Sequence, residues 1–133
     1  MSFNKKIVEE VVVGILLNKN GEILIAKRRN NQFMPGYWEL PGGKIEVGEN
    51  KKSSLKRELF EELGVTVKKS SLKHTMCHKY PDKVVKLWIY NVDKYSGEPS
   101  GQEGQDTSWC SLDQLKKYKL LPTMREIIHK ISL

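Results

Sequence analysis

The stretch "GGKIEVGENKKSSLKRELFEELGV", residues Gly42–Val65, decides the fold because it joins a glycine-rich turn to a helix with an uneven charge distribution. Asn50 is suited to cap the start of that helix, and Gly64 is suited to end it in a left-handed conformation. Between them, leucines recur at every fourth position, which predicts one buried stripe. The sequence therefore predicts a helix that runs to about Leu63 with one apolar face.

Three glutamates crowd the end of this helix. Glu58, Glu61 and Glu62 stand at i, i+3 and i+4 and so project from one face. Like charges at i, i+4 cost about 0.2–0.5 kcal/mol, and each carboxylate near a helix C-terminus opposes the dipole by roughly 0.3–1 kcal/mol. Two interpretations follow: a solvated acidic face that tolerates these small penalties, or a site where a divalent cation supplies the missing positive charge. The spacing alone leaves both open.

Toward the N-terminus the pattern is that of strands. Residues 11–17 form a short run of β-branched and aliphatic side chains, typical of a buried strand. Asn20-Gly21 is a hairpin signal, and residues 22–28 predict the returning strand. Polar residues 30–37 predict a loop, and the run Pro41-Gly42-Gly43 predicts a turn.

Toward the C-terminus, residues 72–80 and 84–92 predict two strands joined at Pro81-Asp82, and residues 96–104 predict a loop. Two capping-box spacings predict short final helices, namely Ser111 with Gln114 ahead of residues 112–118, and Thr123 with Glu126 ahead of residues 124–131. The sum is a mixed sheet with helices packed on it, in a single domain of residues 1–133.

Composition bounds the class of protein. The chain has 133 residues and carries 23 Lys and Arg against 16 Asp and Glu, a net charge of +7 that favours anionic partners. Cys77 and Cys110 suggest no disulfide framework, and we expect both to be unreactive core thiols. No apolar run approaches the roughly 20 residues that span a bilayer, and the first ten residues lack a signal-peptide pattern. We therefore expect a cytoplasmic protein with no membrane partner.

The stretch from Gly43 fits the complete pattern G-x5-E-x7-R-E-U-x-E-E-x-G-U, where U is bulky and aliphatic. The matching residues are Gly43, Glu49, Arg57, Glu58, Leu59, Glu61, Glu62, Gly64 and Val65. This pattern resembles the signature of the Nudix hydrolases. The segments "WELPGGK", "KYPDKVVKLWIYNV", "SGEPSGQEGQ" and "WCSLDQL" are similar to the MutT branch, the 8-oxo-dGTP diphosphatases, and extend the resemblance from about Val8 to Ile131. The resemblance implies an α/β (α+β) fold in which a mixed β-sheet is sandwiched between helices.

The resemblance also implies a magnesium site, in which Mn²⁺ can substitute. Glu62 and the carbonyl of Gly42 would hold the ion, with Glu58 and Glu61 reaching it directly or through water. Glu103 matches a further family carboxylate near the metal. Such an ion neutralises pyrophosphate charge and orients an attacking water, and a carboxylate accepts the proton. Glu58 and Glu103 are both candidates for that base.

Supporting and substrate-contacting roles follow in the same way. Arg57 would lock the helix by pairing with Glu49 or Glu61, while Gly43 and Gly64 are structural. The residues implied to contact substrate are Arg28, Phe33, Glu39, Leu40, Pro41, Gly42, Tyr80 and Met124. Of these, Arg28 matches the family's phosphate-contacting arginine. Tyr80, with Val85, would flank the base unless both are simply core residues. We expect three tryptophans to pack in or at the edge of the core, namely Trp38, Trp88 and Trp109.

One position departs from the branch. Met124 stands where the MutT pattern places an Asn or Asp that reads the edge of the oxidised purine, and methionine cannot donate and accept there. Thr123 could take that role if the register shifts by one residue.

The implied activity is a Mg²⁺-dependent nucleoside triphosphate pyrophosphohydrolase. It would release a monophosphate and pyrophosphate from 8-oxo-dGTP or a related nucleotide, as in nucleotide-pool sanitation and DNA repair. A pyrimidine or methylated nucleotide, or another nucleoside diphosphate linked to X, stays open. A nucleotide sensor without activity is disfavoured by the complete glutamate set, and a nucleic-acid binder by its scattered basic residues. A monomer or weak homodimer is expected.

Overall fold

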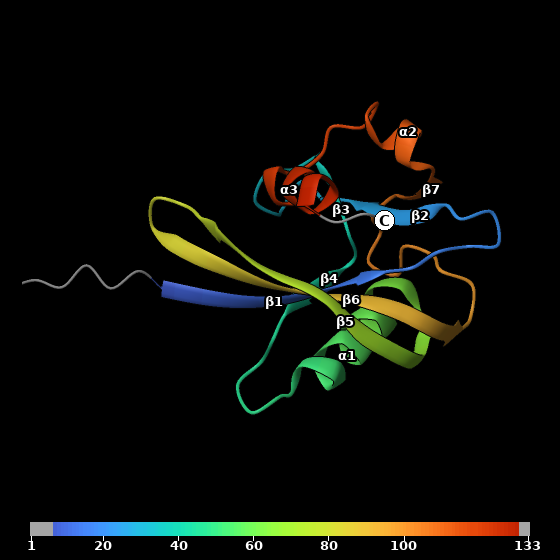
Figure 1. Cartoon of the computed structure of the whole chain (residues 1–133), viewed down its shortest axis with the longest axis horizontal. Coiled ribbons are helices and arrows are strands. Elements are labelled where there is room, and N and C mark those ends of the chain that lie inside the picture. The colour runs from blue at the N-terminus through green and yellow to red at the C-terminus, as the bar shows by residue number, and fades with distance from the viewer. Residues whose placement is uncertain (1–6, 131–133) are drawn as a thin grey trace, which may run out of the picture.

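The structure is a computed structural model that describes residues 7–130. It contains two sheets and three helices, with the sheets meeting face to face across part of the core (Figure 1). In spatial order the mixed sheet consists of β4 (Gly42–Lys44), β1 (Ile7–Ile15), β6 (Lys83–Ser96) and β5 (Thr66–Lys79). The second, antiparallel sheet consists of β3 (Trp38–Glu39), β2 (Ile23–Lys27) and β7 (Thr107–Cys110). The helices are α1 (Lys51–Leu63), α2 (Leu112–Leu115) and α3 (Pro122–Lys130).

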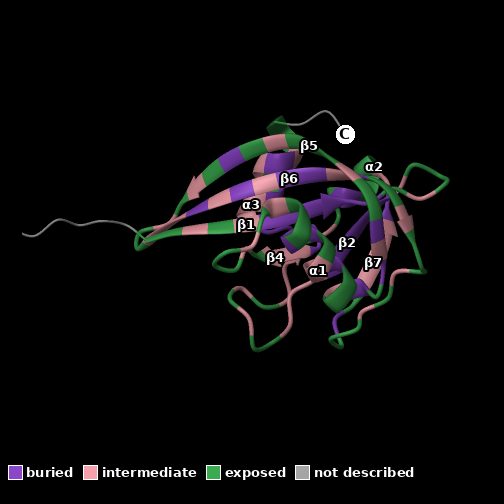
Figure 2. Cartoon of the chain, turned by 90° about the horizontal axis from the view of Figure 1, so that it is seen from below, coloured by how far each residue is buried: buried purple, intermediate pink, exposed green. Residues whose placement is uncertain are grey.

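The mixed sheet is covered on both faces, as the α/β expectation required. Helix α1 lies on one face, and the second sheet with α3 lies on the other (Figure 1). Strand β1 runs parallel to β6 through the centre, and its side chains alternate between the two layers. Val12 and Leu16 pack in the cluster under α1, whereas Val13 and Ile15 pack in the cluster under α3. Figure 2 shows how the buried positions concentrate along the central strands.

Helix α1 is confirmed with its predicted ends. The Asn50 carboxamide oxygen accepts the Ser53 N–H at 2.8 Å, and Gly64 ends the helix with a φ of 73°. The predicted stripe of Leu55, Leu59 and Leu63 is fully buried. Close approach to the sheet needs a glycine in β1, because a Cβ on Gly14 would lie 3.0 Å from the Leu59 side chain. The ends of α1 are therefore set by its caps, and its close approach to the sheet is allowed by Gly14.

The predicted N-terminal hairpin is confirmed at its turn, but the predicted pairing of its two strands beyond the turn is wrong. The turn closes with Leu17 paired to Ile23, and Gly21 takes a positive φ of 74°. Past that bridge the strands diverge, so β1 joins the mixed sheet and β2 joins the other. Residue pattern did not reveal this, because β2 and the second half of β1 are buried on both faces and would suit either sheet.

Other local predictions need correction. Gly42 and Gly43 form strand β4 against β1 rather than a turn, and β7 was not foreseen. Cys77 is exposed on the edge strand β5, whereas Cys110 is a buried core thiol as expected. The last helix begins at Pro122, so Thr123 lies inside it and is not its cap. The capping box at Ser111 is confirmed.

Further expectations concern the core edge and the chain ends. The three tryptophans are partly buried against the two core clusters, as predicted. Position 131, the predicted end of the last helix, lies outside the described residues. Within residues 7–130, no helix combines the length and apolar character required to cross a membrane.

Replacing Leu59 with Ala should lower the free energy of unfolding by about 2–5 kcal/mol, because it opens a cavity between α1 and β1. The neighbouring Phe60 is 60% exposed, so Phe60→Ala is the matched control and should change stability by less than about 1 kcal/mol. Urea denaturation of both variants measures the difference. Equal losses would contradict the assigned orientation of α1.

Candidate active site

Arg57 is the hub of the acidic region. Its guanidinium forms a two-pronged ion pair with Glu49, at 2.7 Å from Nε and 3.0 Å from Nη2. Nη1 reaches Glu58 at 2.9 Å and Glu61 at 3.2 Å, and Nη2 also donates to the Lys44 carbonyl. Of the two partners expected from sequence, Glu49 and Glu61, Arg57 therefore contacts both. The hydrogen bonds from Arg57 lower the pKa of Glu49 to about 2, so this carboxylate is charged at neutral pH.

Glu62 and Glu58 lie against the glycines of β4. The Gly42 N–H donates to the Glu62 carboxylate at 3.0 Å. Gly43 leaves room for Glu58, because a Cβ at position 43 would lie 2.2 Å from the Glu58 carboxylate. A Cβ on Gly42 would in turn meet the Val12 carbonyl at 2.0 Å. Both glycines thus permit close contact between the strand, its neighbour and the acidic helix.

The loop that carries Glu103 docks on the C-terminal end of α1. The Ser100 N–H donates to the Leu63 carbonyl at 3.1 Å, and the Gln102 N–H donates to the Glu62 carbonyl at 3.0 Å. Carbonyls in the last turn of a helix lack partners within the helix, and here the loop supplies them. The docking places Glu103 near Glu58 and Glu62, whose pKa values its charge raises.

The carboxylates in this region are under-compensated. Burial is the largest influence on Glu62 and raises its pKa to about 8; the Gly42 N–H opposes this, while Glu39, Glu103 and Glu58 add to it. Burial also raises the pKa of Glu58, against the opposing effect of Arg57. Glu61 lies on the same face and its side chain is 52% exposed. One guanidinium therefore contacts four acids, Glu46, Glu49, Glu58 and Glu61, and Glu62 is left with a backbone donor.

This donor set fits a hard divalent cation, since burial and the neighbouring acids raise the pKa values of Glu58 and Glu62, which therefore lack compensating positive charge. Glu58, Glu61, Glu62 and Glu103 could supply such oxygens. They are not gathered into a finished coordination sphere: within residues 7–130, no three Asp, Glu, His or Cys side chains converge closely enough to enclose an ion.

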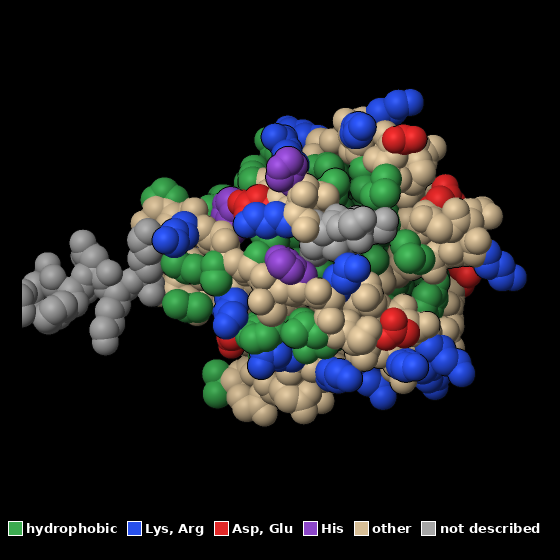
Figure 3. Space-filling view, in the orientation of Figure 1, with side chains coloured by type: hydrophobic (Ala, Val, Ile, Leu, Met, Phe, Trp, Pro, Cys, Tyr) green, Lys and Arg blue, Asp and Glu red, His purple; other side chains and the backbone are tan. Residues whose placement is uncertain are grey.

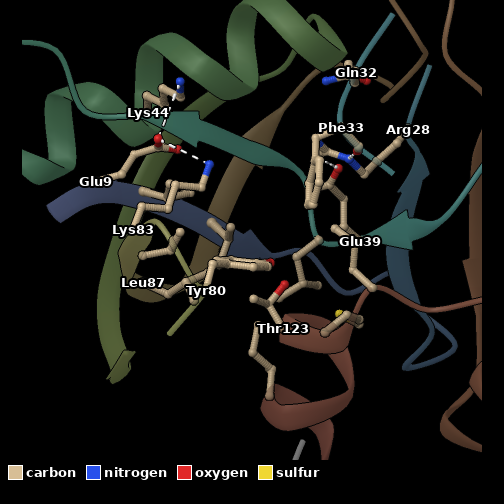
Figure 4. Close-up of a pocket in the computed structure, with 17 residues that line it drawn as sticks. Glu9, Arg28, Gln32, Phe33, Glu39, Lys44, Tyr80, Lys83, Leu87 and Thr123 are labelled. Carbon is tan, nitrogen blue, oxygen red and sulfur yellow. Dashed lines mark hydrogen bonds and ion pairs between the residues drawn. The ribbon is translucent and has the colours of Figure 1, made fainter. Parts of the chain in front are cut away.

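A cavity of about 370 Å³ lies beside the acidic region, between the mixed sheet and α3 (Figure 4). Its floor is apolar and comes from β1, β6 and α3. Its polar lining consists of Glu9, Arg28, Gln32, Glu39, Lys44, Tyr80, Lys83 and Thr123. The segment from Glu39 to Lys44 borders both regions, because Glu39 and Lys44 line the cavity while Gly42 contacts Glu62. The volume suits a small ligand with one apolar part and several polar contacts.

Most predicted substrate residues line this cavity. Arg28 pairs with Glu39 at 2.7 Å and also donates to the Phe33 carbonyl, so it fixes the neighbouring loop. Phe33 is 59% exposed, and its ring meets Tyr80 edge to face at 5.9 Å between centroids. Leu40 contributes to the floor, whereas Pro41 and Gly42 are not among the lining residues.

Met124 and Thr123 occupy different places at the start of α3. Met124 is only 1% exposed and forms part of the apolar floor. Figure 4 shows the Thr123 side chain beside Tyr80, with its hydroxyl directed into the cavity. Because Thr123 lines the cavity, a ligand bound there can contact its hydroxyl.

Sequence reasoning missed a charged group at one end of the cavity. Glu9 lies 3.6 Å from the Lys44 ammonium and 3.5 Å from that of Lys83 (Figure 4). The contact depends on the parallel pairing of β1 with β6, which local patterns do not predict. Gln105, a buried amide between Glu62 and Glu103, was also missed. Its only sequence signal was its place two residues after Glu103.

Comparisons with known proteins agree with this geometry. The family model described as NUDIX domain matches residues 12–130. An 8-oxo-dGTP diphosphatase of Escherichia coli K12 is 38% identical over 92% of this chain and 95% of its own length. A CTP pyrophosphohydrolase of the same organism is 31% identical over 84% and 82%. A solved structure from work on MutT of Aliivibrio salmonicida and Vibrio cholerae is 30% identical, with a TM-score of 0.76 over 93% of this chain and 99% of that one.

The Glu62 carboxyl should make the metal-free protein less stable as pH rises. Its pKa is about 8 when folded and near 4.5 when free, so between these values the folded state binds more protons than the unfolded chain. Stability therefore falls through this window. Glu62→Gln should be about 1–3 kcal/mol more stable than the parent at pH 8.5, with little difference at pH 4.5.

Thermal unfolding in chelator at both pH values measures this, with Glu61→Gln on the exposed part of the same face as the control. A Glu62→Gln variant that gained nothing at pH 8.5 would show that the folded protein already balances this charge.

Proposed function

This chain belongs to the Nudix family, and we propose that it is a MutT-type nucleoside triphosphate pyrophosphohydrolase that converts 8-oxo-dGTP or a related nucleotide to the monophosphate and pyrophosphate. Membership makes it a hydrolase of phosphoanhydride bonds. The observation that carries the proposal is the under-compensated carboxylate cluster beside a ligand-sized cavity. Because the segment from Glu39 to Lys44 borders both the cavity and the carboxylate cluster, one bound ligand would reach both.

We assign the metal to this cluster. Glu62, Glu58 and Glu103, with Glu61 and the Gly42 carbonyl in reach, would hold Mg²⁺ or Mn²⁺. Such an ion, when bound, neutralises phosphate charge and makes water a better nucleophile. Arg57 holds Glu58 and Glu61 on the helix and ties the helix to Glu49. Because Arg57 is not in the cavity lining, its role is to orient carboxylates rather than to bind substrate.

Two carboxylates can accept the proton of the attacking water. Burial raises the pKa of Glu58, which brings it closer to the neutral range where a general base works best. Glu103 comes from the docked loop rather than from α1. Both remain candidates, and comparing the pH dependence of kcat in Glu58→Gln and Glu103→Gln would separate them.

The cavity would receive the nucleoside. Tyr80 and Phe33 offer aromatic surfaces, and Lys83 lies 5.7 Å and 5.9 Å from their ring centroids. Met124 provides only apolar contact, so base selection rests on polar groups such as Thr123 and Glu39. A relative that bears the name CTP pyrophosphohydrolase supports keeping a pyrimidine nucleotide as the second candidate substrate.

Two other functions are less well supported. A sensor without activity has no need for buried carboxylates such as Glu58 and Glu62, whose pKa values are raised by burial and by the neighbouring acids. A nucleic-acid binder would present an uninterrupted basic stripe, whereas Figure 3 shows Lys and Arg over much of the visible face, most densely along its lower right edge, with acidic side chains among them.

Removing the central carboxylate tests the proposal. Glu62→Gln should lower kcat by at least about 100-fold while the protein stays folded, because a charged oxygen next to the metal is lost. Pyrophosphate release should be followed with a panel of ordinary, oxidised and methylated nucleoside triphosphates in the presence of Mg²⁺. Near-parental turnover by Glu62→Gln, or no turnover of any nucleotide by the parent protein, would refute it.

The Thr123 hydroxyl should contribute to base selection. Thr123→Val should lower kcat/KM for the best nucleotide of that panel by about 5- to 10-fold, since a lost hydrogen bond costs about 1 kcal/mol. Thr107→Val, in β7 and outside the cavity lining, is the matched control. A Thr123→Val variant whose kcat/KM for that nucleotide equals that of the parent would remove this residue from the base site.

A further inference from the structure

Gln105 is a buried amide between the two segments that carry the acidic cluster. It is 9% exposed. Within residues 7–130, Gln105 and Ser54 are the two polar residues that are buried. Its Oε1 accepts the Glu103 N–H at 3.0 Å, and its Nε2 donates to the Glu62 carbonyl at 3.1 Å. The side chain thus connects the peptide groups of two acidic residues that are 41 positions apart in the chain, counting from 62 to 103.

The backbone contacts of the loop do not by themselves fix Glu103. Ser100 and Gln102 dock on α1 through their N–H groups, but Glu103 comes after them at the turn. Gly104 follows with a φ of 82°, and its N–H closes the turn on the Gly101 carbonyl. A glycine next to Glu103 leaves that peptide free to rotate unless something holds it.

Two side chains hold Glu103, each through one of the two peptide groups that flank it. Gln105 binds its N–H, and Arg29 donates from Nη1 to the Glu103 carbonyl at 3.2 Å. The Arg29 contact is exposed, whereas the Gln105 contact is partly buried and leads directly to α1. Gly101 packs closely against Gln105, because a Cβ at position 101 would lie 1.9 Å from the backbone carbonyl oxygen of Gln105. The Gln105 side-chain amide therefore links the backbone of Glu103 to the backbone of Glu62.

We propose that Gln105 is a positioning residue, which sets the Glu103 carboxylate against Glu62 so that both face one ion. This rests on the proposed function, in which these carboxylates hold a divalent metal. Only an amide of this length serves both contacts, because one end must accept and the other must donate. Asn is one methylene shorter and cannot span the two partners, and Met has similar length but no hydrogen-bonding groups.

The test compares Gln105→Met with Gln102→Met, a matched substitution in the same loop. The Gln102 amide donates to the Ser100 hydroxyl and is exposed. Gln105→Met should lower both kcat and the affinity for Mn²⁺ alone, measured by paramagnetic resonance without nucleotide, by about 10- to 100-fold. Gln102→Met should change neither by more than about twofold. If Gln105→Met folds poorly, Gln105→Asn takes its place, because it keeps a polar group in the buried position. Gln105→Asn should show the same losses of kcat and Mn²⁺ affinity.

A double-mutant comparison separates positioning from general support. If Gln105 acts through Glu103, Gln105→Met should add less than about threefold to the loss already caused by Glu103→Gln. Equal losses in both backgrounds, parental values in Gln105→Met and Gln105→Asn, or parental values in Glu103→Gln would each overturn the proposal.

If Glu62→Gln retains turnover, the proposed function fails. If Glu62→Gln is inactive and the Gln105 variants behave as the parent, only the role of Gln105 fails.

Discussion

The contact on which the rest of the site depends is the two-pronged ion pair between Arg57 and Glu49. It joins the loop before α1 to the helix, and the same guanidinium reaches Glu58, Glu61 and the Lys44 carbonyl. Without it, three glutamates on one helical face would repel one another and the strand beside them would lose a donor. One positive group therefore offsets part of the unfavourable electrostatics of this helical face.

That arrangement still leaves the acids short of positive charge, and the shortage is greatest at Glu62. The end of α1 is also where backbone carbonyls lack partners, so a loop is needed there for structural reasons. The loop that fills this need brings Glu103 with it. In the proposed mechanism, the loop that supplies donors to the helix end is also the one that supplies the further carboxylate.

Much of this could be predicted from sequence, and the limits have physical causes. The caps, the leucine stripe and the spacing of the glutamates are local properties of α1, so Asn50, Gly64 and Leu59 were assigned correctly. The divergence of β1 and β2 into separate sheets was missed, because strands buried on both faces carry no sign of their neighbours.

The same limit applies to the site. Glu9 reaches Lys83 only through a parallel strand pair, and Gln105 reaches Glu62 only through a docked loop. The capping motif at Thr123 was misread for a related reason: Pro122 can occupy the first turn of a helix, so α3 starts earlier than the motif suggested. Contacts between distant segments depend on topology, which single-sequence patterns do not contain.

The mixed sheet separates two tasks. Helix α1 and its acids lie on one face, while the apolar floor of the cavity and α3 lie on the other, and β4 connects them. Met124 on α3 lines the cavity floor and does not contact the charges around Arg57. Selectivity and reactivity can evolve separately in such an architecture, and a lineage can acquire a new substrate while inheriting its chemistry unchanged.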